Sequence, residues 1–353
     1  MRINGHSHLL PYPEEIPAFM KDKEIFWVDG DRKYMRQKGW TRPVTDSSFF
    51  LNEKLEWMEK NKIDHAVVLN LSQLYGNGLS VENMKQALRF QNDFNAKVQS
   101  EHPTKFTCGF VVHAGFIDGA LWEIERCVKL GLKVLCLPTH YMDTTGNWKG
   151  IFNGETEPIL ELANEHNLAV EVHPYDGEKF IKLENVSWRF HLVWMLAQCA
   201  DAYHFYTING YFEKYPNLRV CFAHGGQLNQ INLGRRIQGF DGRPDLFEGK
   251  VRPRKAIGHP NIFFDTLVHD KHSLDLIIKR QGSTDQIIMG LDDPYPLGEM
   301  ESEQQSSYPG KLLDLAIDDG IINKKQYGEI WNDNVVRWLC ADDSADFLAR
   351  VSA

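Results

Sequence analysis

The chain has 353 residues, of which 42% are hydrophobic and 25% charged, values that are ordinary for a globular protein and unlike those of disordered or fibrous chains. Its 39 basic and 48 acidic residues give a net charge of −9. The basic residues are scattered, so no basic stripe would attract nucleic acid or an anionic membrane. We therefore expect a small-molecule partner. The length allows two average domains or one large α/β barrel.

Cysteine usage and the N-terminal residues favour a cytoplasmic protein. The six cysteines form no C-x-x-C pair, and Cys108, Cys136 and Cys221 lie in apolar runs, where a reduced thiol behaves as a small hydrophobe. The first residues contain no apolar signal segment, and no run of roughly eighteen apolar residues occurs anywhere in the sequence. We expect a reducing compartment and no membrane span.

Short apolar runs alternate with longer segments that carry apolar residues at three- and four-residue spacings, a pattern typical of repeated β-α units. The expected strands are residues 2–6, 66–71, 106–112, 133–138, 168–173, 218–224, 261–265 and 286–291. The clearest expected helices are residues 53–62, 81–99, 119–130, 155–166 and 273–280. Eight strands alternating with helices predict a closed (β/α)8 TIM barrel. The first strand is not followed by G-x-G-x-x-G, which disfavours a dinucleotide-binding open sheet.

Two segments depart from the alternation, although we expect residues 1–353 to form a single barrel domain. Residues 9–48 are rich in Pro, Trp, Lys and Asp without sustained periodicity, and such a long insertion after the first strand is typical of a lid or a pocket wall. Residues 310–353 carry a helical pattern throughout. We interpret them as a C-terminal helical layer that braces the barrel.

Four of the expected strands end in residues that can bind a metal ion. In barrel enzymes the C-terminal ends of the strands converge on one cavity. His6 and His8 end the first strand and lie on the same face of it, because side chains alternate along a strand. His173 ends the fifth strand, His224 the sixth, and an Asp-Asp pair the eighth. Imidazole and carboxylate together suit zinc and its neighbours in the transition series.

Three of these positions leave alternatives open. His173 is either a buried structural histidine or a third nitrogen ligand, and its place at a strand end favours the ligand. His224 is either a ligand or a general acid/base, and the two glycines after it, which let a substrate approach closely, favour acid/base chemistry. Asp292 and Asp293 are adjacent, so their side chains point to opposite sides and only one can reach the ion.

Taken together, the motifs resemble those of the amidohydrolase superfamily, and most closely the aminocarboxymuconate-semialdehyde decarboxylase group. The similarity is dense from about residue 106 to residue 299. The motifs that carry it are G-H-S-H at 5–8, F-E-K-Y-P at 212–216, V-C-F-A-H-G-G at 220–226, G-R-R-I at 234–237, R-P-D-L at 243–246, L-V-H-D at 267–270 and D-D-P-Y-P-L-G-E at 292–299. The combination is specific, whereas a single H-x-H or H-G-G is not.

The resemblance implies a role for each motif residue. It implies one divalent metal ion, with zinc favoured over manganese, cobalt and iron, and no organic cofactor. It makes His224 the catalytic histidine that activates water, and it counts Asp292 among the catalytic residues. It also implies a homodimer in which Arg243 holds a substrate carboxylate across the subunit interface, a task that a bidentate guanidinium suits. The implied metal ligands are His6, His8, His173 and Asp292.

Two departures from the family pattern bear on the substrate. The resemblance places a second carboxylate-binding arginine in the helix after the insertion, where this chain has no arginine and Lys54 is the candidate substitute. A pocket tryptophan of the family corresponds to His191. We also expect His140, which follows the fourth strand, to line the cavity. These residues and Arg243 are the expected substrate-binding residues.

The sequence thus favours a metal-dependent, non-oxidative decarboxylase that acts on an unsaturated or aromatic carboxylic acid. The alternative is a metal-dependent hydrolase of a lactone, an amide or a carbon–carbon bond in a ring-cleavage product, which would use the same activated water. A barrel kept only for binding is disfavoured, because four separate strand ends carry metal-compatible residues. The absence of G-x-S-x-G disfavours a serine hydrolase.

Overall fold

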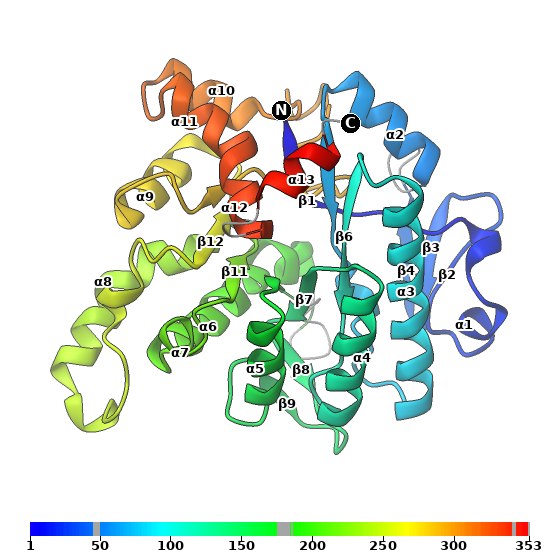
Figure 1. Ribbon diagram of the computed structural model, residues 1–353, viewed down its shortest axis with the longest axis horizontal. Helices are drawn as coiled ribbons and strands as arrows, with labels where there is room; N and C mark the ends of the chain where they lie inside the picture. Colours follow the sequence, from blue (N-terminus) through cyan, green and yellow to red (C-terminus); the bar gives the residue numbers. More distant parts are fainter. Residues whose placement is uncertain (45–49, 175–183, 185, 341–343, 352–353) are drawn as a thin grey trace.

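The predicted barrel is confirmed. The computed structural model describes residues 1–44, 50–174, 184, 186–340 and 344–351. Eight parallel strands form one sheet in the order β1-β5-β6-β7-β10-β11-β12-β13 (Figure 1). The last strand returns to the first, since the Gly5 amide donates a hydrogen bond to the Met289 carbonyl at 2.7 Å. The strands are β1 (Ile3–Ser7), β5 (His65–Val68), β6 (Phe106–Val111), β7 (Val134–Pro138), β10 (Ala169–His173), β11 (Arg219–Phe222), β12 (Ile262–Asp265) and β13 (Ile287–Ile288).

Each strand is buried along its whole length because both faces of the sheet are covered. Alternate residues enter different clusters: Leu135 and Leu137 pack in the layer shared with the outer helices, whereas Val134 and Cys136 belong to the inner cluster. The outer helices are α2 (Leu51–Lys60), α3 (Val81–Glu101), α4 (Ile117–Lys129), α5 (Glu157–Glu165), α6 (Met195–Ile208), α7 (Tyr211–Lys214), α8 (Gln227–Gly242) and α9 (Lys271–Gln281).

The C-terminal segment contains four α-helices within the described residues and packs at the end of the barrel where the strands begin. Trp338 donates from its indole nitrogen to the Arg219 carbonyl at 3.0 Å, and Arg219 donates back to the Trp338 carbonyl at 2.6 Å. Residues 341–343 and 352–353 of this segment lie outside the described residues. The helices are α10 (Lys311–Asp318), α11 (Lys324–Gly328), α12 (Asn334–Cys340) and α13 (Ser344–Val351).

The insertion after β1 has regular structure that its sequence pattern did not reveal. It contains α1 (Ala18–Asp22) and an antiparallel sheet of β2 (Trp27–Val28), β3 (Tyr34–Gln37) and β4 (Trp40–Pro43), which flanks one side of the barrel (Figure 1). Residues 45–48 of the insertion lie outside the described residues. A second unexpected hairpin, β8 (His140–Met142) and β9 (Trp148–Gly150), follows β7.

A buried ion pair fixes α2 to the barrel. Lys54 is 0% exposed, and its ammonium contacts the Asp293 carboxylate and donates to the Ser7 hydroxyl at 2.5 Å. Asn4 donates to the other oxygen of Asp293 at 2.5 Å. Both charges are therefore compensated inside the protein, as buried charges must be. Lys54, expected to bind substrate, is occupied in this pair.

Among the described residues, no helix combines the length and the apolar character needed to cross a membrane. The longest outer helix, α3, carries several charged residues along its exposed face. The covering helices instead pack their apolar faces onto the barrel strands.

We predict that Lys54→Met lowers the free energy of unfolding by about 3–5 kcal/mol, because it leaves the Asp293 carboxylate buried and unpaired. Lys54→Met combined with Asp293→Asn removes both charges and should recover part of that loss. Urea unfolding of the two variants and the parent measures the difference. A single variant as stable as the parent would contradict a charged buried pair.

Candidate metal centre and active-site cavity

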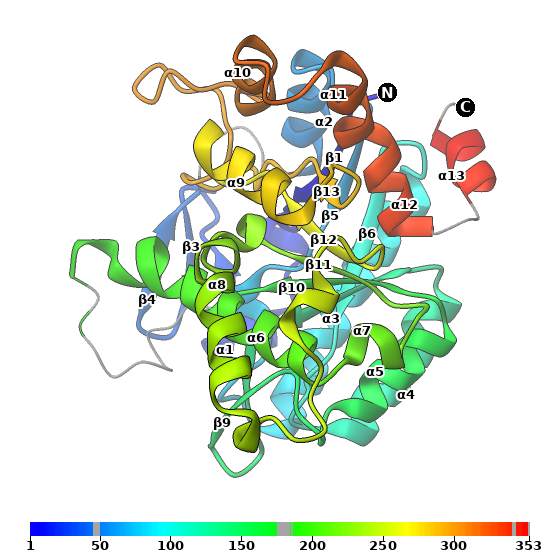
Figure 2. The same ribbon diagram turned by 90° about the vertical axis from the view of Figure 1, so that its left-hand side faces the viewer.

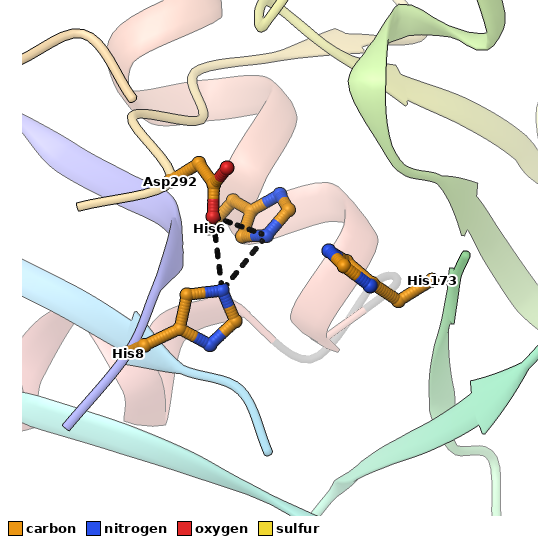
Figure 3. A group of neighbouring side chains, drawn as sticks. All are labelled: His6, His8, His173 and Asp292. Atoms are coloured by element: carbon orange, nitrogen blue, oxygen red, sulfur yellow. Dashed lines mark hydrogen bonds and ion pairs between the residues drawn. The ribbon is translucent and has the colours of Figure 1, made fainter. Parts of the chain in front are cut away.

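Four side chains predicted as metal ligands meet at the C-terminal ends of β1, β10 and β13 (Figure 3). The Nε2 atoms of His6 and His8 lie 3.2 Å apart. Oδ1 of Asp292 lies 3.1 Å from Nε2 of His8 and 3.6 Å from Nε2 of His6. With His173, the four ligand atoms all lie within 4.8 Å of one another, and every side chain is buried.

The three histidines are oriented by acceptors bound to their other ring nitrogen. Nδ1 of His6 lies 2.8 Å from the Asp265 carboxylate, Nδ1 of His8 lies 3.1 Å from the Leu69 carbonyl, and Nδ1 of His173 lies 2.7 Å from the Pro174 carbonyl. Carbonyl and carboxylate oxygens accept hydrogen bonds, so Nδ1 carries the proton in each ring. The three Nε2 atoms consequently face one another, which is the arrangement of metal-binding histidines.

The donor set fits a single divalent ion. Two ligands of a tetrahedral ion bound at about 2.1 Å lie ~3.4 Å apart, and two ligands on opposite sides lie ~4.2 Å apart. The separations of 3.1, 3.2 and 3.6 Å match the shorter value. Nε2 of His173 is buried without a hydrogen-bond partner, which an ion among the four groups would supply. We conclude that this is a divalent-metal site.

Electrostatics also prepare the four groups for a cation. Burial lowers the pKa of His8 and of His173, which keeps both rings neutral. Burial also disfavours a charged His6, but the hydrogen bond to Asp265 and the charge of Asp292 outweigh it and raise the pKa of His6 to about 9. Binding of an ion at Nε2 of His6 would therefore displace a proton from that ring. Burial favours a neutral Asp292, yet its interactions with His8 and His6 hold the pKa of that carboxyl below its ordinary value.

Asp265, at the end of β12, is a positioning residue that the sequence analysis did not single out. Besides binding His6, its carboxylate accepts hydrogen bonds from the amides of His224 at 3.0 Å, Gly225 at 2.7 Å and Leu267 at 3.1 Å. The Asp265 side chain therefore fixes both the orientation of His6 and the backbone of the H-G-G turn. Its position as the last residue of an apolar strand is the sequence feature that could have identified Asp265.

His224 stands beside the metal ligands without being one of the four. Its Nε2 is buried, has no hydrogen-bond partner and lies 3.9 Å from Oδ2 of Asp292. Burial lowers the pKa of His224 to about 4, so the ring is neutral near pH 7 and can accept a proton. The turn depends on glycine: Gly225 has φ 63°, and a Cβ there would lie 2.1 Å from Val268.

These groups open onto a cavity of about 120 Å³. One wall residue, Arg42 on β4, is a cation that comes from the insertion. Its Nη2 donates a hydrogen bond to Nε2 of His191 at 2.7 Å. The Arg42 guanidinium also lies 5.7 Å from the centre of the Tyr295 ring. Sequence reasoning missed Arg42 because the insertion carried no periodicity that would place it. The basic and acidic side chains of the lining are Arg42, His173, His191, His224, His269 and Asp292.

The remaining expected substrate-binding residues lie outside this cavity. Lys54 pairs with Asp293 beneath it. Nε2 of His140 lies 3.0 Å from Asp201, and His140 is not among the lining residues. Arg243 is exposed and forms an ion pair with Asp245 at 2.7 Å, also away from the lining of its own chain's cavity. Of the four expected substrate-binding residues, His191 alone lines the cavity of its own chain.

Known proteins resemble the chain over nearly its whole length. A decarboxylase of Dictyostelium discoideum named 2-amino-3-carboxymuconate-6-semialdehyde decarboxylase is 27% identical over 329 residues, covering 89% of this chain and 85% of its own. A mutant 5-carboxyvanillate decarboxylase of Novosphingobium aromaticivorans, solved with manganese and 3-methoxy-4-hydroxy-5-nitrobenzoic acid, has a TM-score of 0.74 at 14% identity and covers 96% of each chain.

A third similar structure is a dihydroxybenzoic acid decarboxylase of a Polaromonas species, solved with manganese and the inhibitor 2-nitroresorcinol. It has a TM-score of 0.69 at 16% identity, again over 96% of each chain. The sequence profile of the family described as "Amidohydrolase" matches residues 3–310. That match spans all eight barrel strands and all four ligands, and the chain therefore belongs to the amidohydrolase family.

Proposed function

We propose that the protein is a metal-dependent, non-oxidative decarboxylase of an unsaturated or aromatic carboxylic acid. The observation that carries this proposal is the buried His6, His8, His173 and Asp292 cluster, with His224 beside it and the Arg42 guanidinium in the same cavity. The names of the similar proteins support it, because all three are decarboxylases of small carboxylic acids. Hydrolysis is the alternative outcome of the test below.

The resident ion that we propose is zinc, held by three imidazoles and one carboxylate, a donor set that suits it. The manganese in two of the similar structures makes that ion the other candidate. When bound, such an ion would polarise a substrate oxygen and lower the pKa of water.

The chain's own residues supply the remaining steps. Arg42 carries the charge that would bind the substrate carboxylate through charge-assisted hydrogen bonds. The apolar side chains of Leu192, Met195 and Leu267 line the same cavity and would pack against a ring. The neutral His224 is placed to take up a proton from solvent and become an imidazolium. As the carbon–carbon bond breaks, carbon dioxide leaves, and the electron pair left on the carbon accepts that proton, which returns His224 to its neutral form.

The proposed role of Arg243 requires a second copy of the chain. Helix α8 and the short turn after it project from the barrel (Figures 1 and 2), and this arm exposes apolar Ile231 at 67% and Leu246 at 60%. Arg243 lies at its tip, 62% exposed. We propose a homodimer in which the arm of each subunit brings Arg243 to its partner's cavity, where it binds a substrate carboxylate.

A reducing location accords with the described cysteines. All six have free thiols, and five of them are buried. We propose that the protein is cytoplasmic, since thiols persist in that compartment.

The metal assignment predicts a contrast between two sets of variants. His6→Ala combined with His8→Ala should lose nearly all bound metal, because two of four ligands are gone. His224→Ala should keep the metal and lose turnover by a factor of about 10² to 10⁴, the usual effect of removing a general acid/base. Elemental analysis alongside rate measurement tests both. Metal loss in His224→Ala proportional to its loss of activity would make His224 a ligand.

The reaction assignment predicts carbon dioxide release from a panel of hydroxybenzoates, aminocarboxymuconate semialdehyde and ring-cleavage acids by the metal-loaded protein. Arg42→Met should lower kcat/KM about 10- to 150-fold, because a charged hydrogen bond contributes about 1.5–3 kcal/mol. Arg36→Met is the matched control, since Arg36 lies on the neighbouring strand and pairs with Asp29. Product formation without carbon dioxide would identify a hydrolase.

The shared site predicts complementation between two inactive variants. Arg243→Ala and His224→Ala homodimers should each be nearly inactive. After dissociation and reassociation as a mixture, half of the dimers should be mixed, and each mixed dimer should contain one site with both residues. Roughly a quarter of the parent activity should then return. If mixing restores nothing, or if sedimentation shows a fully active monomer, Arg243 does not act across an interface.

A further inference from the structure

A second cavity lies outside the barrel, between α3 and α4. It has a volume of about 350 Å³, larger than the cavity at the metal centre, and the two share no lining residue. Its walls are mainly apolar and aromatic. The wall residues are Met84, Leu88, Val112, Phe116, Ala120 and Trp122.

The inner end of this cavity carries a hydrogen-bond donor. His113 is 8% exposed and lines the cavity. The Gly115 amide donates to Nδ1 of His113 at 3.1 Å, so Nδ1 has no proton and the neutral ring carries it on Nε2. Burial lowers the pKa of His113 to about 4, which keeps the ring neutral. Within the part of the chain that the structure describes, Nε2 forms no hydrogen bond, so it can donate to a ligand in the cavity.

The mouth of the cavity is lined by two cations one helical turn apart on α3. The Lys85 ammonium lies 4.4 Å from the centre of the Phe116 ring, and the Arg89 guanidinium lies 4.8 Å from the centre of the Trp122 ring. The aromatic walls thus hold both cations at the entrance. Trp122 is 53% exposed, unusual for a large aromatic side chain.

The two acidic groups of the lining do not cancel this charge. Glu123 is already compensated, because Arg126 donates to it at 2.6 and 2.9 Å and Asn92 at 2.7 Å. Asp118 lies exposed in the first turn of α4, where the helix N-terminus stabilises a carboxylate. A ligand in the cavity can therefore contact the cations Lys85 and Arg89 at the mouth and the neutral donor His113 inside.

We propose that this cavity is a second small-molecule site, which binds a planar aromatic monoanion with an oxygen acceptor opposite its carboxylate. The ring packs between Phe116 and Trp122, the carboxylate contacts Lys85 and Arg89, and the acceptor receives the hydrogen bond from Nε2 of His113. Hydroxybenzoates have this chemistry. The site is independent of the metal centre and of the reaction proposed there.

The test uses 3-bromo-4-hydroxybenzoate with the metal-loaded protein. Crystals soaked in this probe should show an anomalous bromine peak in the cavity between α3 and α4. Calorimetry should detect a matching binding event in solution. Lys85→Met combined with Arg89→Met should remove that peak and weaken that event at least tenfold. The catalytic constants should stay unchanged, because neither residue lines the metal cavity.

Lys97→Met combined with Lys129→Met also removes two positive charges, from positions on α3 and α4 that do not line the cavity, and this control should bind like the parent. A bromine peak confined to the metal cavity would overturn the proposal. So would equal binding by the Lys85 and Arg89 double variant, or equal affinity for the neutral 3-bromo-4-hydroxybenzyl alcohol. A peak between α3 and α4 alone would support the second site and count against the proposed function.

Discussion

The buried carboxylate of Asp265 is the constraint on which the active site depends. It accepts one hydrogen bond from His6 and three from the amides of residues 224, 225 and 267. Burial favours a neutral Asp265, but the hydrogen bond from His6 holds its pKa below the ordinary value. The resulting negative charge orients His6 and the turn that carries His224, so the metal centre and the proposed proton donor share one support.

Two adjacent aspartates after the eighth strand have different surroundings. Asp292 and Asp293 are neighbours, and their side chains point to opposite sides: Asp292 reaches the histidines, whereas Asp293 reaches Lys54 and Asn4. The carboxylate of Asp292 is available to bind a metal ion, whereas the carboxylate of Asp293 is paired with the buried Lys54. This division explains why Lys54 stabilises the barrel wall and is not part of the cavity lining.

The residues that we propose to recognise the substrate lie outside the regular repeat. Arg42 comes from the insertion after β1, His191 precedes α6, and Arg243 is carried by an arm beyond α8. The barrel core holds the four groups of the metal centre and His224 in fixed places. In the proposed function, loops and insertions supply the cations that bind the acid, in keeping with the separation of scaffold and specificity in barrel enzymes.

The sequence by itself determined the barrel and pointed to the four residues of the metal centre, because apolar periodicity and strand-end residues are local properties. The runs around Val134 and Val170 predicted strands, and His6, His8 and His173 could be placed at one mouth from strand order alone. Only the tertiary structure decided that Arg42 lines the cavity, that Lys54 pairs with Asp293, and that His113 faces a second cavity. Those facts depend on contacts between segments far apart in the chain, which no local pattern encodes.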